Sequence, residues 1–156
     1  MSVNVGQKAP NFTLLDVNFK PRSLQEFIGS QNIVLVFFPA AFSSVCTKEL
    51  CTFRDSMIKL NSLKANVIGI SVDTPFVQKA FADFNKLNFT LLSDFNKEVI
   101  KLYGVVLQDL LGLKELAKRA VFIIDKEGII RYKWVSDDPR VEPNYNEIIK
   151  ELERIE

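Results

Sequence analysis

The chain has no histidine and only two cysteines, Cys46 and Cys51, among its 156 residues. The absence of histidine excludes Cys/His and Ser/His/Asp catalysis, because both arrangements need an imidazole base. Two thiols are also too few for a zinc site of four soft ligands. We therefore expect neither a metal nor another cofactor, and any cysteine chemistry must be supported by other residue types.

The chain also lacks an excess of charge of either sign. Twenty lysine and arginine residues face nineteen aspartate and glutamate residues, which gives a formal net charge of +1. No basic block or acidic tail is present, so the composition argues against nucleic acid or a membrane surface as a partner. A small molecule or another protein is the expected partner.

Long apolar runs are absent as well. No segment reaches the roughly 18 uninterrupted apolar residues of a membrane span, and residues 1–15 lack the basic start and apolar run of a signal peptide. We therefore expect a cytoplasmic protein. With 47% hydrophobic and 25% charged residues, the chain has the size and balance of one globular domain over residues 1–156.

Apolar periodicity predicts three buried strands and two helices. The runs 32–38, 66–72 and 119–125 are continuous and β-branched, as in strands covered on both faces. Between the first two runs, residues 46–64 predict one crossover helix. Its apolar face comprises Cys46, Leu50, Phe53, Met57 and Leu60. A second helix is expected to start near Asp73 or Thr74, either of which can cap it, and to run to residue 86. Pro75 falls in its first turn, and its inward face is expected to be Phe76, Ala80 and Phe84.

The rest of the chain completes an α/β layout. Residues 89–94 predict a further strand, residues 96–104 a short helix closed by Gly104, and residues 119–135 a hairpin that turns at Gly128. An amphipathic helix is expected to begin near Asn144. This order predicts a mixed sheet with helices on both faces. Residues 105–118 are the least regular, and their leucines fit either the core or an apolar rim beside a site.

The segment around Cys46 has a possible chemical role. Pro39 ends the first buried strand and a helix begins near Ser43 or Ser44, so Cys46 falls in the first helical turn. Unpaired amide groups and the helix dipole favour an anion there, so a thiol loses its proton more readily. The alternative is structural, because Cys46 also lies on the apolar face and free cysteine is commonly buried.

Three segments carry a family resemblance. The segment "PAAFSSVC", residues 39–46, resembles the active-site pattern of peroxiredoxins, in which a proline, a threonine or serine and a cysteine have this spacing. The segment "KAPNFTLLD", residues 8–16, is similar to the opening hairpin of that family. The segment "KRAVFIIDKEG", residues 118–128, is similar to the part that supplies an active-site arginine. The nearest branch is that of bacterioferritin comigratory protein and AhpE, within the AhpC/TSA superfamily.

The resemblance implies both a fold and an activity. The fold would be thioredoxin-like, with a central mixed β-sheet flanked by helices and an N-terminal β-hairpin extension. The activity would be that of a thiol peroxidase acting on hydrogen peroxide or organic hydroperoxides. By the same resemblance Cys46 is the peroxidatic thiolate, Ser43 takes the threonine position, Pro39 shields the site, and Glu49 orients Arg119.

The physical argument for Arg119 agrees with the resemblance. Attack of a thiolate on an O–O bond develops negative charge on the departing oxygen, which donors from Ser43, Arg119 and the Cys46 amide would stabilise. Two departures from the family pattern are visible: serine replaces the commoner threonine at position 43, and residues 40–42 are more apolar than usual. The alternative for Arg119 is a solvated charge at the start of a strand.

Cys51 is the candidate resolving residue. A sulfenic acid on Cys46 can condense with a second thiol, and Cys51 is the only other one in the chain. On an intact helix this pair is separated by about 7.5 Å of rise and some 140° of rotation, whereas a disulfide needs Cα atoms roughly 4.4–6.8 Å apart. The helix must therefore unwind locally. The alternative is a one-cysteine cycle resolved by an external thiol.

Two rival functions and the partners stay open. A thioredoxin-like disulfide oxidoreductase would share the fold but needs a tight Cys-x-x-Cys, whereas four residues separate these thiols. A binding or scaffold module would keep the fold without the activity. The implied partners are a peroxide and a thioredoxin-like or other thiol reductant. A homodimer is also possible, with Phe42, Tyr132 and Trp134 either at its surface or in ordinary core positions.

Overall fold

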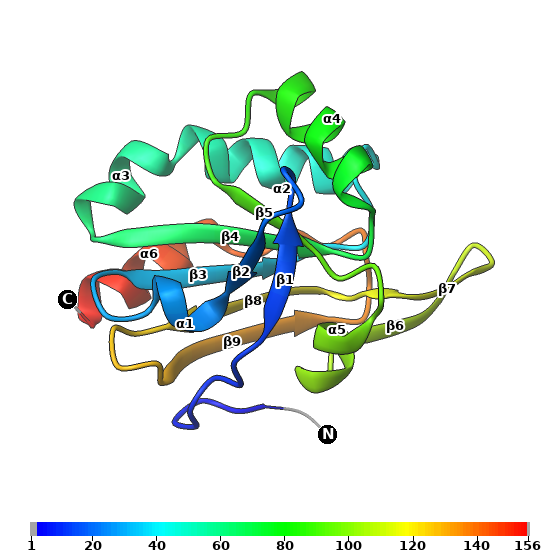
Figure 1. Ribbon diagram of the computed structural model, residues 1–156. Helices are drawn as coiled ribbons and strands as arrows, with labels where there is room; N and C mark the ends of the chain where they lie inside the picture. Colours follow the sequence, from blue (N-terminus) through cyan, green and yellow to red (C-terminus); the bar gives the residue numbers. More distant parts are fainter. Residues whose placement is uncertain (1–2, 156) are drawn as a thin grey trace.

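The computed structural model describes residues 3–155, which form a seven-stranded mixed sheet with helices on both faces (Figure 1). The strands of this sheet are β1 (Thr13–Asp16), β2 (Pro21–Ser23), β3 (Asn32–Phe37), β4 (Ala65–Ser71), β5 (Thr90–Ser93), β8 (Arg119–Ile124) and β9 (Ile130–Ser136). They lie in the order β2-β1-β5-β4-β3-β8-β9. Strand β4 runs parallel to both β3 and β5, and the other pairs are antiparallel. The mixed sheet and the N-terminal hairpin are therefore confirmed.

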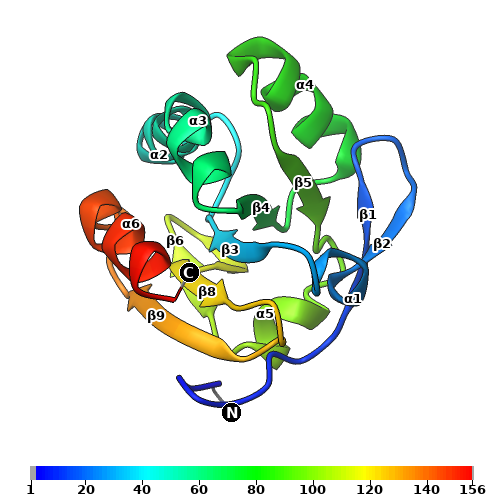
Figure 2. The same cartoon turned by 90° about the vertical axis from the view of Figure 1, so that its left-hand side faces the viewer.

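Within residues 3–155, six helices cover the sheet. They are α1 (Leu24–Phe27), α2 (Ser44–Asp55), α3 (Met57–Ser62), α4 (Pro75–Asn85), α5 (Glu98–Leu102) and α6 (Tyr145–Arg154). Helices α2, α3, α4 and α6 pack on one face, and α1 and α5 on the other (Figure 2). Every residue of β3 and of β8 is buried, as expected for strands covered on both sides.

The predicted crossover helix is correct in its buried face and wrong in its continuity. Cys46, Leu50, Phe53, Met57 and Leu60 are all buried. The helix nevertheless breaks into α2 and α3 at Ser56. The Ser56 hydroxyl donates to the Thr52 carbonyl at 2.8 Å, and its amide is shared between the carbonyls of Thr52 and Phe53. Such bonding to the preceding turn competes with the regular helix, and hydrophobic periodicity does not detect it.

The prediction for α4 names the wrong face. Phe76 and Phe84 are 73% and 79% exposed, and Ala80 is exposed as well. The buried residues of α4 are Pro75, Gln78 and Phe81. The Gln78 amide donates to the Ser71 hydroxyl and to the Leu92 carbonyl, both at 2.9 Å. A glutamine can occupy a core position when its amide nitrogen is paired in this way, so hydrophobicity alone selects the neighbouring face.

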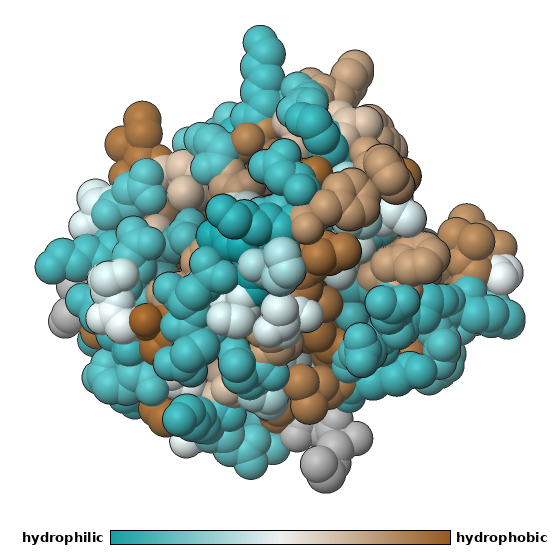
Figure 3. All heavy atoms as spheres, in the orientation of Figure 1, coloured by the Kyte–Doolittle hydropathy of each residue, from teal (hydrophilic) through white to brown (hydrophobic). Residues whose placement is uncertain are grey.

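The irregular segment 105–118 forms a second, two-stranded sheet. Strands β6 (Val106–Leu110) and β7 (Leu113–Ala117) pair antiparallel and project from the body of the molecule (Figure 1). Leu116 packs in the core, whereas Leu111 at the turn is 95% exposed. Figure 3 shows apolar residues gathered over α4 and at the tip of this hairpin. The leucines are thus divided between core and surface.

The remaining element predictions are confirmed. Strands β8 and β9 form the expected hairpin, in which Gly128 has a φ of +85° that favours glycine. Helix α5 is followed by Gly104 with a φ of +70°, and Asn144 caps α6 by accepting from the Glu147 amide at 3.1 Å. Within residues 3–155 no helix is long and apolar enough to cross a membrane.

Candidate active site

Cys46 lies where the carboxyl end of β3 passes into α2. Strand β3 ends at Phe37, the buried Pro39 follows, and α2 begins at Ser44, so Cys46 falls in the first turn as predicted. Amide groups of a first turn have no carbonyl partner within their helix and favour negative charge nearby. The local sequence therefore sets the thiol at the positive end of a twelve-residue helix.

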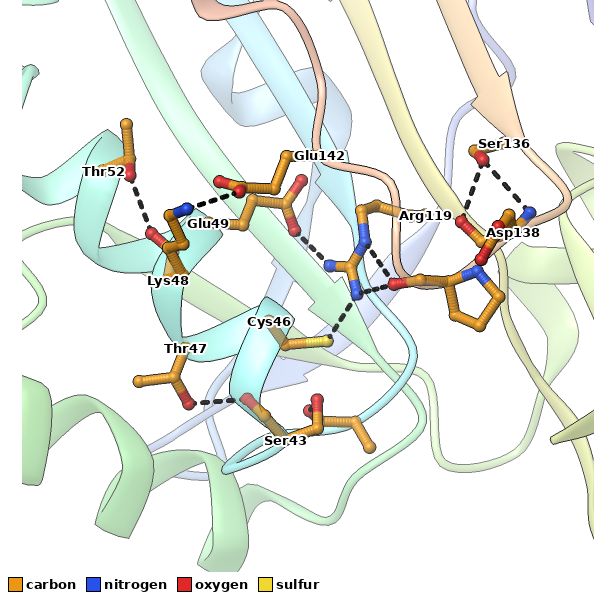
Figure 4. A network of polar contacts seen from close by, with 12 residues as sticks. Ser43, Cys46, Thr47, Lys48, Glu49, Thr52, Arg119, Ser136, Asp138 and Glu142 are labelled. Carbon is orange, nitrogen blue, oxygen red and sulfur yellow. Dashed lines mark hydrogen bonds and ion pairs between the residues drawn. The ribbon is translucent and has the colours of Figure 1, made fainter. Parts of the chain in front are cut away.

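Ser43 is the N-cap residue of α2 by its position but not by its side chain. Its hydroxyl makes no capping bond and donates instead to the Ala40 carbonyl at 2.8 Å. The Ser43 side chain is exposed and lies on the loop before the helix (Figure 4). The structure thus keeps Ser43 near the start of α2, and no contact between its hydroxyl and the sulfur of Cys46 is found in residues 3–155.

Arg119 brings a guanidinium to the sulfur. It is the first residue of β8, and the antiparallel register of β8 with β3 carries it to the end of β3 that leads to Cys46. Its Nη2 lies 3.2 Å from Cys46 Sγ, and its Nη1 lies 2.7 Å from Glu49 Oε1 (Figure 4). Only 1% of Arg119 is exposed. It is therefore not a solvated charge, and its guanidinium donates directly to the sulfur of Cys46.

The carbonyl of Pro139 is a further partner of Arg119 that sequence reasoning missed. It accepts from Nε at 3.1 Å and from Nη2 at 2.7 Å. Pro139 belongs to the connection between β9 and α6. With Glu49 and Cys46, it gives the planar guanidinium three acceptors that fix its orientation. A backbone carbonyl has no side-chain signature, so the sequence contains no signal for this contact.

Glu49 is a fully buried carboxyl group one helical turn beyond Cys46. Burial raises the pKa of Glu49 from an ordinary value of 4.5 to about 7, although the guanidinium of Arg119 opposes the shift. Only Oε1 contacts Arg119, and Oε2 has no hydrogen-bond partner within residues 3–155. The ionised carboxylate is therefore incompletely compensated, which favours uptake of a proton near neutral pH.

This shift predicts a pH-dependent stability that the substitution Glu49→Gln removes. The folded protein binds the Glu49 proton more tightly than the unfolded chain does, so the stabilisation is fully present below pH 4.5 and is lost as the pH rises through about 7. Urea unfolding at pH 5 and pH 8 measures the difference in unfolding free energy between wild type and Glu49→Gln. Between pH 5 and pH 8, the unfolding free energy of wild type is expected to fall relative to that of Glu49→Gln by on the order of 2–3 kcal/mol. A difference independent of pH would contradict the raised pKa.

Cys46 is buried as well as being in contact with a guanidinium. It has no exposed surface, and it packs with Phe38, Leu50, Phe81 and Leu91. The structural interpretation of this residue is therefore right about burial, and the 3.2 Å contact between its sulfur and Arg119 is a feature that burial alone does not explain. A peroxide larger than a water molecule reaches the sulfur only after a neighbouring segment moves.

Asp73 supports the loop between β3 and α2, a role that the sequence did not indicate. The sequence offered Asp73 or Thr74 as the cap of α4, and Thr74 is the residue that caps it. Asp73 Oδ2 instead accepts from the Ala41 amide at 2.8 Å and from the Ser71 hydroxyl at 2.7 Å. An acid just beyond a parallel strand is the signal that was available, because β4 ends at Ser71, beside β3 at the same edge of the sheet.

Cys51 lies on the same helix as Cys46, and both thiols are free. Cys51 is partly buried, and its Sγ donates to Asn85 Oδ1 of α4 at 3.6 Å. Among the described residues no group of three or more acidic or thiol side chains is arranged to hold a metal ion. The chemistry available at this site is therefore that of thiols, a guanidinium and a carboxyl group.

A mixed sheet of this topology, with a thiol at a helix start beside a buried guanidinium, defines a thiol-dependent oxidoreductase of thioredoxin-like fold. The sequence profile of the AhpC/TSA family matches residues 5–133. Peroxiredoxin Q of Populus jackii, a chloroplastic protein, is 39% identical over 153 residues, which cover 98% of this chain and 70% of that protein. The chloroplastic peroxiredoxin Q of Arabidopsis thaliana is 46% identical over 129 residues, which cover 83% of this chain and 58% of that protein.

A solved structure gives the same result. The crystal structure of peroxidoxin BcpB from Mycobacterium tuberculosis superposes with a TM-score of 0.88 at 31% identity, covering 97% of each chain. The chain belongs to the AhpC/TSA family. It is a peroxiredoxin of the branch that includes peroxiredoxin Q and BcpB, and hence a thiol-dependent peroxidase.

Proposed function

We propose that Cys46 is the peroxidatic residue of this enzyme and that it reduces hydrogen peroxide and organic hydroperoxides. The observation that supports this assignment is the 3.2 Å contact between Cys46 Sγ and Nη2 of the buried Arg119. Cys51, the other thiol, has no such partner among the described residues; its sulfur donates to an amide oxygen. Within residues 3–155, Cys46 is thus the thiol whose sulfur contacts a guanidinium.

The proposed first step is attack of the Cys46 thiolate on one oxygen of the peroxide. An S–O bond forms, the O–O bond breaks, and the second oxygen leaves as hydroxide or alkoxide and takes up a proton. Arg119 can shift its donors from the sulfur to the departing oxygen, because Glu49 and the Pro139 carbonyl hold its other groups. Ser43 can donate to the substrate only after its hydroxyl leaves the Ala40 carbonyl.

The proposed second step is attack of Cys51 on the sulfenic acid of Cys46. Both residues lie on α2, five positions apart, so their disulfide requires α2 to unwind. The break at Ser56 supports this route, since unwinding can end there without melting α3. A one-cysteine cycle would leave Cys51 a packing residue, and an external thiol would then reduce the sulfenic acid directly.

Intact mass spectrometry of the reduced protein, treated with one equivalent of hydrogen peroxide, tests both steps. Wild type is expected to lose the mass of two hydrogen atoms, as an intramolecular disulfide, and the substitution Cys51→Ser is expected to gain one oxygen. If oxidised wild type carries only sulfenic or higher acids, the internal route is wrong. The peroxidatic assignment of Cys46 would still stand.

We also propose a reductant, a homodimer and a cellular location for this protein. A thioredoxin-like protein or another small thiol would reduce the Cys46–Cys51 disulfide, since the chain has no third cysteine. A homodimer would form through exposed aromatic residues near the site. Phe42 is half-exposed, whereas Tyr132 and Trp134 pack in the core against α6, which leaves Phe42 as the candidate. We retain the cytoplasm as the proposed location, although both peroxiredoxin Q proteins compared above are chloroplastic.

A further inference from the structure

The thiol of Cys51 is tied to a neighbouring helix. Its Sγ lies 3.6 Å from Oδ1 of Asn85, the last residue of α4. The amide nitrogen of the same side chain donates to the Phe81 carbonyl at 3.0 Å, which fixes the orientation of the Asn85 oxygen. Helices α2 and α4 lie on the same face of the sheet (Figure 2). The thiol hydrogen bond therefore joins two separate elements.

Two further bonds beyond Cys51 join α2 to the end of α4 and to the connection that follows it. Nη1 of Arg54 donates to the Asn85 carbonyl at 2.5 Å, and Nδ2 of Asn88 donates to the Arg54 carbonyl at 3.4 Å. The first is charge-assisted and is the strongest of the three. We call these four residues, Cys51, Arg54, Asn85 and Asn88, the α2–α4 latch. It fastens the carboxyl-terminal half of α2 to the end of α4.

We propose that the α2–α4 latch sets the rate at which Cys51 resolves the sulfenic acid of Cys46, with Arg54 and Asn85 as positioning residues. This inference rests on the internal route proposed above. Cys51 must leave Asn85 before its sulfur can approach Cys46, and Arg54 must release the Asn85 carbonyl before the last turn of α2 can move away from α4. Opening of the latch is therefore part of the resolution step.

The chemistry of that step is balanced without a further reagent. The Cys51 thiol gives up its proton, its sulfur attacks the Cys46 sulfur, the S–S bond forms and the S–O bond breaks. The hydroxide that leaves takes up the proton as water. Cys46 is reduced from the sulfenic level and Cys51 is oxidised. A closed latch prolongs the life of the sulfenic acid, during which a second peroxide can oxidise it to the sulfinic acid.

Rapid-quench mass spectrometry of wild type, Asn85→Ala and Arg54→Met tests the latch. Formation of the sulfenic acid is expected at the wild-type rate, because neither residue contacts Cys46 or Arg119. Formation of the disulfide is expected to be faster by about 3-fold in Asn85→Ala and about 10-fold in Arg54→Met, as for the loss of one neutral and one charge-assisted hydrogen bond. The sulfinic fraction at high peroxide should fall in both.

Matched controls separate the latch from general loosening. Asn61→Ala, at an exposed position of α3, and Arg154→Met, at an exposed position of α6, remove the same side-chain types away from Cys51 and are expected to behave as wild type. Hydrogen exchange should accelerate in the α2 amides of the two latch variants and stay unchanged in β3. If either latch variant folds poorly, Asn88→Ala removes only the 3.4 Å bond to the Arg54 carbonyl and should show a smaller acceleration in the same direction.

The outcomes distinguish the latch from the proposed function. If wild type forms the Cys46–Cys51 disulfide and both latch variants form it at the same rate or more slowly, the latch is wrong and the internal route stands. If wild type forms no such disulfide, the internal route fails and the latch fails with it. Faster disulfide formation in Asn61→Ala or Arg154→Met would also overturn the inference, because the effect would not be specific to the latch.

Discussion

Replacement of Cys46 with serine is expected to abolish peroxide reduction. A serine hydroxyl at the start of α2 retains the size and the hydrogen-bonding position of the thiol, but it does not ionise near neutral pH and is a weak nucleophile without a neighbouring base. The chain has no histidine to act as that base. Stopped-flow measurement of peroxide consumption, with a thiol reductant present, should give a rate indistinguishable from buffer with reductant alone.

The matched control for this substitution is Cys51→Ser. It makes the same exchange on the same helix, five residues away, and is expected to keep the wild-type rate of the first oxidation while losing the intramolecular disulfide. Peroxide consumption by Cys46→Ser at a rate close to wild type would mean that Cys51 is the reacting thiol. The assignment of the two cysteines would then have to be exchanged.

Replacement of Arg119 with methionine is expected to slow the reaction of Cys46 with hydrogen peroxide by about 10²–10³-fold. Methionine fills much of the same space, but it removes the only cation in contact with Cys46 Sγ in residues 3–155, and with it the donors for the departing oxygen. The rate constant of sulfenic acid formation is measured under single turnover, so that resolution does not obscure it. Arg154→Met, on the exposed side of α6, is the matched control.

The same substitution has a second, pH-dependent consequence. Removal of Arg119 leaves Glu49 buried without a counter-ion, and breaking a buried pair from one side costs about 3–5 kcal/mol. Glu49 can avoid part of this cost by taking up a proton, so the loss of unfolding free energy should be larger at pH 8 than at pH 5. Arg119→Lys keeps a charge but loses the planar set of donors, and an intermediate rate is expected. If Arg119→Met forms the sulfenic acid at the wild-type rate, the guanidinium has no role in the reaction of Cys46 with peroxide.

The sequence predicted most of the layers of the fold because its strands carry an unambiguous signal. Runs such as 32–37 and 119–124 are wholly apolar after their first residue and are buried in full, so their type follows from composition. The face of α4 was missed because Gln78 is buried with its amide paired. The hairpin at 106–117 was missed because half of it has no core to pack against, so its apolar pattern is irregular.

The residues of the site were also predicted only in part from the sequence. Pro39, Cys46 and Glu49 lie close together along the chain, where strand and helix signals fix their order, and the sequence alone set Cys46 in a first helical turn. Arg119 was identified through family resemblance, since 73 residues separate it from Cys46. No local signal pointed to the Pro139 carbonyl or to the contact between Cys51 and Asn85. Asp73 had one, its place just after a parallel strand, but its bond to the Ala41 amide is between residues 32 positions apart.

By itself, then, the sequence determined the elements, the buried strands, and a cysteine at the positive end of a helix. These features depend on interactions between residues a few positions apart, which periodicity reports directly. Only the tertiary structure decided that Arg119 is buried against the sulfur, that Cys46 is closed off from solvent, and that Cys51 is tied to α4. Those features depend on the register of β8 against β3 and on the packing of α2 against α4, where the polar groups of distant segments must pair because burial has removed them from water.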